Sequence, residues 1–159
     1  MKQTVYIETT VPSYYHETRN DARSTVWREL TQEWWETQRN HYQCFTSDFA
    51  VLELQKGDHP AKKKKLALIE ELPRLDYVEE IDDIVEIYIK NLVMPDDAQG
   101  DAAHLAMASY HGMDYLLTWN CRNLANANKF GHIQKINLKL GLNTPLIITP
   151  EQLFQGGPQ

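Results

Sequence analysis

The segment from Gln99 to Asn123, QGDAAHLAMASYHGMDYLLTWNCRN, constrains the fold more than any other part of the chain. An Ala-rich helix opens at Asp101, Gly112 ends it, and a short apolar strand then runs to Thr118. In α/β folds, strand ends and helix starts carry the chemistry. The groups placed there are a carboxylate, a hydroxyl and the carboxamide of Asn120, which are hard oxygen ligands. This choice favours Mg²⁺ or Mn²⁺ over zinc or a covalent nucleophile.

Two further acids occupy similar positions. A buried strand over Val5–Ile7 ends at Glu8, and a second strand ends near Phe45, before a helix that contains Glu53. These acids and Asp101 are far apart in the sequence, yet each lies at or near a strand-to-helix junction. A parallel sheet brings such junctions together at one edge, so we expect the three carboxylates to converge.

The remaining patterns predict alternating helices and strands. Apolar residues at three- and four-residue steps predict helices over Ser24–Arg39, Ala61–Leu72, Asp82–Asn91, Ala102–His111 and Asn126–Leu140. Ser47 or Asp48 is expected to cap the helix with Glu53. Strands are predicted over Val5–Ile7, Tyr42–Phe45, Tyr77–Val78, Tyr115–Thr118 and Leu146–Ile148. This alternation predicts an α/β fold with a parallel sheet covered on both faces.

Composition bounds the class of protein. The chain has 159 residues, 42% hydrophobic and 24% charged, as is typical of one globular domain. We expect this domain to span residues 1–155, with residues 156–159 as a flexible tail. No apolar run approaches the ~20 residues of a membrane span, and the start lacks a secretory segment. Cys44 and Cys121 fit no metal-binding spacing, so we expect a cytoplasmic protein with reduced thiols and no membrane contact.

The net charge of −6 argues against a protein that binds nucleic acid through bulk electrostatics. It does not exclude a nuclease, because clustered active-site carboxylates add negative charge that metal ions offset. The basic run Lys62–Lys65 is typical of a solvated helix start, and a contact to RNA phosphate is the alternative.

Carboxylates around a hard cation suit phosphodiester hydrolysis, since the metal lowers the pKa of a bound water and neutralises phosphate charge. The candidate metal ligands are Glu8, Glu53 and Asp101, and Thr118 and Asn120 complete the candidate catalytic set. Each has a structural alternative: a solvated acid at Glu8 or Glu53, a helix cap at Asp101, a turn residue at Asn120. Thr118 fits a supporting hydroxyl better than a ligand. His104 is more typical of a hydrogen-bonded helix histidine than of a base.

Four segments together resemble the PIN domain, and in particular a bacterial branch of VapC-like toxins. They are VYIETTVPSYY with Glu8, VLELQKGD with Glu53, GDAAHLAMASY with Asp101, and DYLLTWNCRNLANANKFGHI with Asn120. The resemblance runs from Val5 to about Phe154. It implies a PIN-like three-layer α/β/α fold with a central, mainly parallel sheet, and a Mg²⁺- or Mn²⁺-dependent endoribonuclease. It also implies an RNA substrate, a homodimer and an antitoxin partner of a type II toxin–antitoxin pair.

The chain departs from the family pattern at three positions. Glu8 stands where most PIN domains have Asp, and Asn120 stands where many of them have Asp. Asn123 stands where related sequences often have His. These changes bear on catalytic strength more than on the fold. A catalytically weak PIN-fold module that acts by binding a protein or RNA partner is therefore the alternative. A phosphoacceptor receiver domain is disfavoured, because the first strand ends in a single Glu followed by two Thr.

Overall fold

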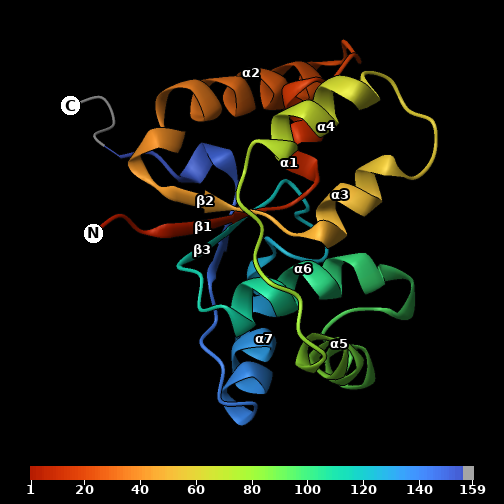
Figure 1. Ribbon diagram of the computed structural model, residues 1–159, viewed down its shortest axis with the longest axis vertical. Helices are drawn as coiled ribbons and strands as arrows, with labels where there is room; N and C mark the ends of the chain where they lie inside the picture. The colour runs from red at the N-terminus through yellow and green to blue at the C-terminus, as the bar shows by residue number, and fades with distance from the viewer. Residues whose placement is uncertain (156–159) are drawn as a thin grey trace.

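A computed structural model describes residues 1–155 of the chain (Figure 1). Its sheet has the strand order β2-β1-β3-β4, and every neighbouring pair is parallel. The strands span Thr4–Ile7 (β1), Gln43–Phe45 (β2), Tyr115–Leu117 (β3) and Leu146–Ile148 (β4). Because all four strands run the same way, their carboxyl ends lie at one edge of the sheet. The predicted tail at residues 156–159 lies outside the described residues.

The central strand β1 shows why these short segments form a buried sheet. Val5, Tyr6 and Ile7 are all fully buried, as expected for a parallel strand covered on both faces. Tyr6 packs with one hydrophobic cluster, whereas Val5 and Ile7 pack with the other, because successive side chains point to opposite faces. The two clusters are the two interfaces between sheet and helices.

Helices cover both faces and make the predicted three-layer α/β/α arrangement (Figure 1). On one face lie α1 to α4, which span Thr10–Tyr15, Ala22–Thr37, Asp48–Gln55 and Lys62–Glu70. On the other lie α5 to α7, which span Glu80–Lys90, Gln99–Tyr110 and Ala127–Lys139. Short 3-10 helices occur at Arg39–His41 (η1), Asp96–Ala98 (η2) and Pro150–Gln152 (η3). Within residues 1–155, no helix is long and apolar enough to cross a membrane.

Side-chain caps set where several helices begin. Ser47 caps α3 as predicted, since its hydroxyl accepts a hydrogen bond from the Ala50 amide. Asp21 caps α2 in the same way through the amide of Ser24. The α3 cap places that helix directly after β2, so Glu53 faces the carboxyl edge of the sheet.

Two predictions from the sequence are wrong. Tyr77–Val78 is not a strand, and the sheet has four strands within the described residues. The chain instead pairs with the sheet edge earlier, at Pro73–Leu75, where the backbone of Thr46 donates to Pro73 and accepts from Leu75 in an isolated parallel bridge that does not extend to Tyr77. The helix predicted from Ala102 begins earlier, at Gln99, so Asp101 lies inside its first turn and the alternative of a helix cap at Asp101 is excluded.

Candidate active site

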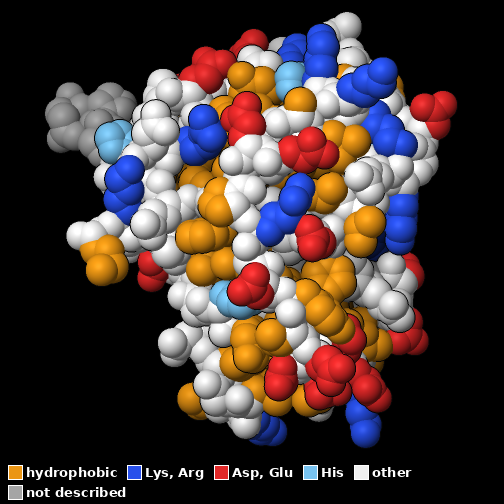
Figure 2. Space-filling view, viewed as in Figure 1, with side chains coloured by type: hydrophobic (Ala, Val, Ile, Leu, Met, Phe, Trp, Pro, Cys, Tyr) orange, Lys and Arg blue, Asp and Glu red, His pale blue; other side chains and the backbone are white. Residues whose placement is uncertain are grey.

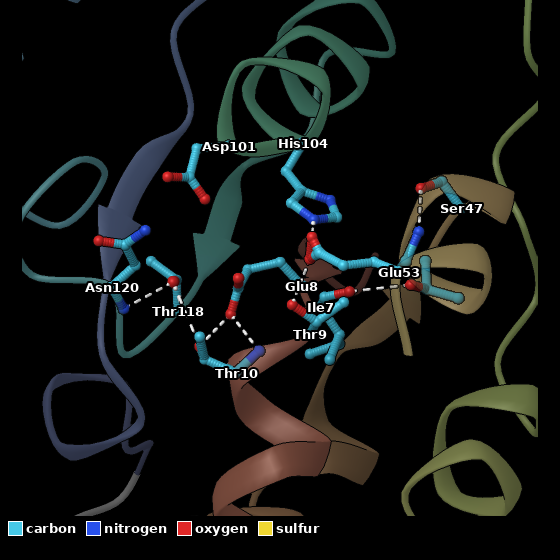
Figure 3. A network of polar contacts seen from close by, with 12 residues as sticks. Ile7, Glu8, Thr9, Thr10, Ser47, Glu53, Asp101, His104, Thr118 and Asn120 are labelled. Atoms are coloured by element: carbon cyan, nitrogen blue, oxygen red, sulfur yellow. Dashed lines mark hydrogen bonds and ion pairs between the residues drawn. The ribbon is translucent and has the colours of Figure 1, made fainter. Parts of the chain in front are cut away.

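The predicted site residues gather where the strands end (Figure 3). Glu8 directly follows β1, and Thr118 and Asn120 follow β3. Glu53 reaches in from α3, and Asp101 from the first turn of α6. In the view of Figure 3, Asp101 and Asn120 lie on one side of Glu8 and Glu53 lies on the other.

Glu8 is the buried centre of this group, with 1% of its surface exposed. Its Oε1 accepts hydrogen bonds from the Thr10 amide, at 2.7 Å, and from the Thr10 hydroxyl. Burial raises the pKa of Glu8 to about 7, although the charge of His104 and the Thr10 hydrogen bonds act to lower it. The carboxyl group therefore gains its negative charge only near neutral pH.

Thr10 also joins the ends of β1 and β3. Its hydroxyl accepts a 2.8 Å hydrogen bond from the Trp119 amide and lies 3.4 Å from the Thr118 hydroxyl. The Thr118 hydroxyl in turn accepts a bond of 2.9 Å from the Asn120 amide. The loop after β3 is thus held against Glu8 by threonine hydroxyls.

His104 lies fully buried on α6, between two of the acids. Its Nδ1 is 2.7 Å from the Tyr6 phenol oxygen, and its Nε2 is 3.3 Å from Glu53 Oε1. Burial acts to lower the pKa of His104, but the hydrogen bond and charge of Glu53 and the charges of Glu8 and Asp101 outweigh it and raise that pKa. The neighbouring carboxylates thus favour the protonated form of the His104 ring.

The network continues from His104 into the core. The Tyr6 phenol shares a 2.6 Å hydrogen bond with the Ser47 hydroxyl. Burial is the largest influence on the phenol and raises its pKa, so it stays protonated. Both ring nitrogens of His104 thus have partners, which agrees with a hydrogen-bonded helix histidine.

Glu53 is less buried than Glu8, with 41% of its side chain exposed. Its Oε1 accepts a 2.7 Å hydrogen bond from the Thr9 hydroxyl in addition to the contact with His104. Burial acts to raise the pKa of Glu53, but the hydrogen bond and charge of His104 and the Thr9 bond prevail and lower it. Gly100 allows this approach, because a Cβ there would lie 3.0 Å from Glu53 Oε2.

Asp101 and Asn120 border the open side of the group. Asp101 Oδ2 accepts a 2.9 Å hydrogen bond from the side-chain NH₂ group of Asn123. Asn120 Oδ1 accepts hydrogen bonds from the backbone amides of Arg122 and Asn123, at 3.3 and 2.9 Å. Because the side-chain oxygen of Asn120 is used by the loop that follows β3, its NH₂ group is the part of the side chain that can bind a ligand.

The side chains at this edge can be compared with the ligands that a divalent ion needs. Residues 1–155 contain no group of three or more His, Cys, Asp or Glu side chains arranged to hold one ion. Magnesium needs only one or two carboxylates, since water and substrate phosphate complete its shell. Glu8 and Asp101 supply that chemistry, while Glu53 is occupied by Thr9 and His104. The residues fit a hydrated ion shared with a substrate rather than a closed three-carboxylate cage.

Sequence reasoning missed the connections between these side chains. Thr9 and Thr10 hold Glu53 and Glu8 in place, Tyr6 holds His104, and Asn123 orients Asp101. The available signal was their position: all three N-terminal residues flank Glu8, and Asn123 lies three residues after Asn120. A cavity of about 660 Å³ lies at the other end of the sheet, beside Asp114 and Thr144, away from the carboxylates.

The fold and this arrangement together define the architecture as PIN-like α/β/α. The crystal structure of FitAcB from Neisseria gonorrhoeae superposes with a TM-score of 0.52 at 16% identity, covering 94% of this chain and 99% of that one. Mycobacterium tuberculosis VapC20, a Sarcin-Ricin loop cleaving toxin, has a TM-score of 0.49 at 15% identity, with 74% and 91% coverage. At 16% identity, the likeness to FitAcB shows the fold alone. No protein-family model and no curated protein matches the chain.

Proposed function

We propose that this protein is a metal-dependent endoribonuclease of the PIN type, a hydrolase that cleaves RNA phosphodiester bonds. The observation that carries the proposal is the placement of Glu8 and Asp101 at the carboxyl edge of the sheet, around the buried His104. A buried carboxyl group whose pKa is raised to about 7, among other acids at the end of a sheet, is typical of a functional site.

The expected cofactor is Mg²⁺ or Mn²⁺. Glu8 and Asp101 would bind the ion directly, and Glu53 would reach it through water. When bound, the ion lowers the pKa of a water molecule and neutralises charge on the phosphate. The chain's own residues prepare this site: Thr10 orients Glu8, and Asn123 orients Asp101.

The loop after β3 would bind the substrate. Thr118 acts as a positioning residue, because its hydroxyl holds the backbone of Asn120. The free NH₂ group of Asn120 would then donate to a phosphate oxygen. An amide cannot replace the charge of an Asp at this position, so Asn120 would serve binding rather than metal ligation.

The biological setting follows from the family resemblance. The chain would be the toxin of a type II toxin–antitoxin pair, acting on RNA in the cytoplasm, inhibited by an antitoxin and assembled as a homodimer. The fold shared with FitAcB supports this assignment at the level of architecture.

A catalytically weak PIN-fold module that binds a partner is the second candidate. Two observations favour it: no three acids or histidines among residues 1–155 form a ready metal cage, and position 120 is an amide. The two candidates differ in whether added metal produces RNA cleavage.

The deciding experiment incubates the purified protein with total RNA in Mn²⁺, in Mg²⁺ and in EDTA. Asp101→Asn should lower the metal-dependent cleavage rate by at least about a hundredfold. It should cost at most ~1 kcal/mol of stability, because it removes one charge from a helix first turn. Asp58→Asn, at an exposed loop position, is the matched control and should cleave like the parent. Equal cleavage by Asp101→Asn and the parent would leave Asp101 with a structural role only.

A further inference from the structure

A layered stack of side chains joins the surface to the candidate site. The guanidinium of Arg23 lies over the Trp27 ring, 4.4 Å from its centroid. Trp27 in turn stacks on Trp119, with the ring centroids 4.4 Å apart and the planes 16° from parallel. Arg23 is exposed, Trp27 is half-buried and Trp119 is buried, so the stack runs from solvent inward.

The inner end of the stack is fixed to the catalytic edge. The Trp119 indole donates a 2.7 Å hydrogen bond to the Thr31 hydroxyl, which holds the ring against α2. The Trp119 backbone amide donates to Thr10, the same residue that donates to Glu8. The stack is therefore one hydrogen-bonded residue away from the buried carboxyl group.

The outer end of the stack is a cation that has an aromatic neighbour but no acidic partner among the described residues. Among residues 1–155, the Arg23 side chain forms no ion pair, whereas Arg19, Arg39 and Arg74 each pair with an acid. A guanidinium placed over an aromatic ring still has N–H groups that can donate, and their geometry matches a phosphate. The ring also limits the motion of the side chain, so less conformational entropy is lost on binding.

Basic side chains gather at one end of the molecule. Although the chain carries −6 overall, Lys and Arg side chains gather over α4 and the neighbouring end of α2, where single acids also lie, and Asp and Glu gather over α5 (Figure 2). The charge of Arg23 also reaches Cys121, in the loop after Asn120, where it opposes the rise that partial burial causes in the thiol pKa. Arg23 thus borders the same loop as the candidate catalytic residues.

We propose that Arg23, held on Trp27, binds a phosphate of the RNA strand next to the one that is cleaved. This inference rests on the proposed function for its substrate class, and it adds the direction in which the strand leaves the site. The strand would cross the start of α2, toward the basic end of the molecule, and away from the acidic α5.

The test measures binding of a fluorescein-labelled single-stranded RNA by anisotropy, in EDTA so that no cleavage occurs, over a series of salt concentrations. Arg23→Gln should weaken binding about tenfold, the effect of losing a hydrogen-bonded charge. It should also reduce the slope of log affinity against log salt by about 0.7, the value for one phosphate contact on a single strand. Arg23→Lys should keep the slope but bind more weakly than the parent, because a lysine cannot form the stacked fork.

Lys139→Gln, at the far end of α7, removes the same charge and is the control. It should bind RNA like the parent, and all variants should melt at the parent's temperature. Parent-like binding by Arg23→Gln, or no RNA binding by the parent, would overturn the inference. Cleavage assays separate the two proposals: RNA binding that depends on Arg23 without metal-dependent cleavage would remove the proposed function and keep the inference. Metal-dependent cleavage at the same rate in Arg23→Gln and in the parent would remove the inference and keep the proposed function.

Discussion

At the scale of single residues, the buried carboxyl group of Glu8 makes the folded protein sensitive to pH. Its pKa is raised from 4.5 to about 7 on folding, so between these values the native state binds more protons than the unfolded state. The stabilisation is fully present below pH 4.5 and is lost as the pH rises through 7. The raised pKa of His104 acts in the same direction, whereas the lowered pKa of Glu53 acts only at acid pH.

Glu8→Gln isolates this contribution, because it keeps the size of the side chain and an acceptor for Thr10. Without metal, the free energy of unfolding of the parent should fall between pH 5 and pH 8 by up to roughly 3 kcal/mol more than that of the variant. Urea unfolding at the two pH values measures the difference. An identical pH dependence in both proteins would show that Glu8 is ionised at pH 5 and that burial does not control it.

At the scale of elements, α6 is fixed to β1 through one polar contact inside an apolar interface. Tyr6 bonds to both His104 and Ser47, so Tyr6→Phe leaves Nδ1 of His104 and the Ser47 hydroxyl without that partner. The variant should lose about 1–3 kcal/mol of stability, the cost of unpaired buried polar groups. Tyr110→Phe, at the exposed end of α6, is the control and should melt like the parent. A parent-like melting temperature for Tyr6→Phe would mean that packing alone docks α6.

Elements with strong local patterns could be predicted from the sequence. The buried strand at Val5–Ile7 and the Ala-rich helix carry continuous or periodic apolar signals, and Ser47 is a typical cap. The strand predicted at Tyr77–Val78 was wrong, because a short apolar segment has the pattern of a strand even when no partner strand pairs with it. The start of α6 was predicted three residues too late, because the acid at Asp101 is typical both of a helix cap and of a first turn.

The candidate site was predictable in its members but not in its connections. Glu8, Glu53, Asp101, Thr118 and Asn120 all lie at the carboxyl edge, because the strands of an alternating β/α chain run parallel and end at the same edge of the sheet. The pairing of Glu53 with His104 depends on how α3 and α6 approach each other, which no local pattern encodes. For the same reason the sequence predicted three equivalent ligands, and the metal-binding roles of all three stay predictions.

At the scale of the whole molecule, the site is an arrangement of negative charge at the edge of an acidic protein. Crowded carboxylates oppose folding unless a proton, His104 or a bound cation offsets their charge. An ion that binds only the native state should therefore both stabilise the fold and prepare the edge for an RNA phosphate. This links the stability of the domain to its proposed activity.

The most direct test of the central claim, that Glu8 and Asp101 bind a divalent ion at this edge, is the melting temperature in a Mn²⁺ titration. The parent should gain about 5 °C at a hundredfold excess of metal over its dissociation constant, because that excess adds about 2.7 kcal/mol. Glu8→Gln, which lacks the ligand charge, should gain little or nothing, and EDTA should reverse the shift in the parent. A parent whose melting temperature does not change at millimolar Mn²⁺, or a Glu8→Gln variant that gains as much as the parent, would contradict the account.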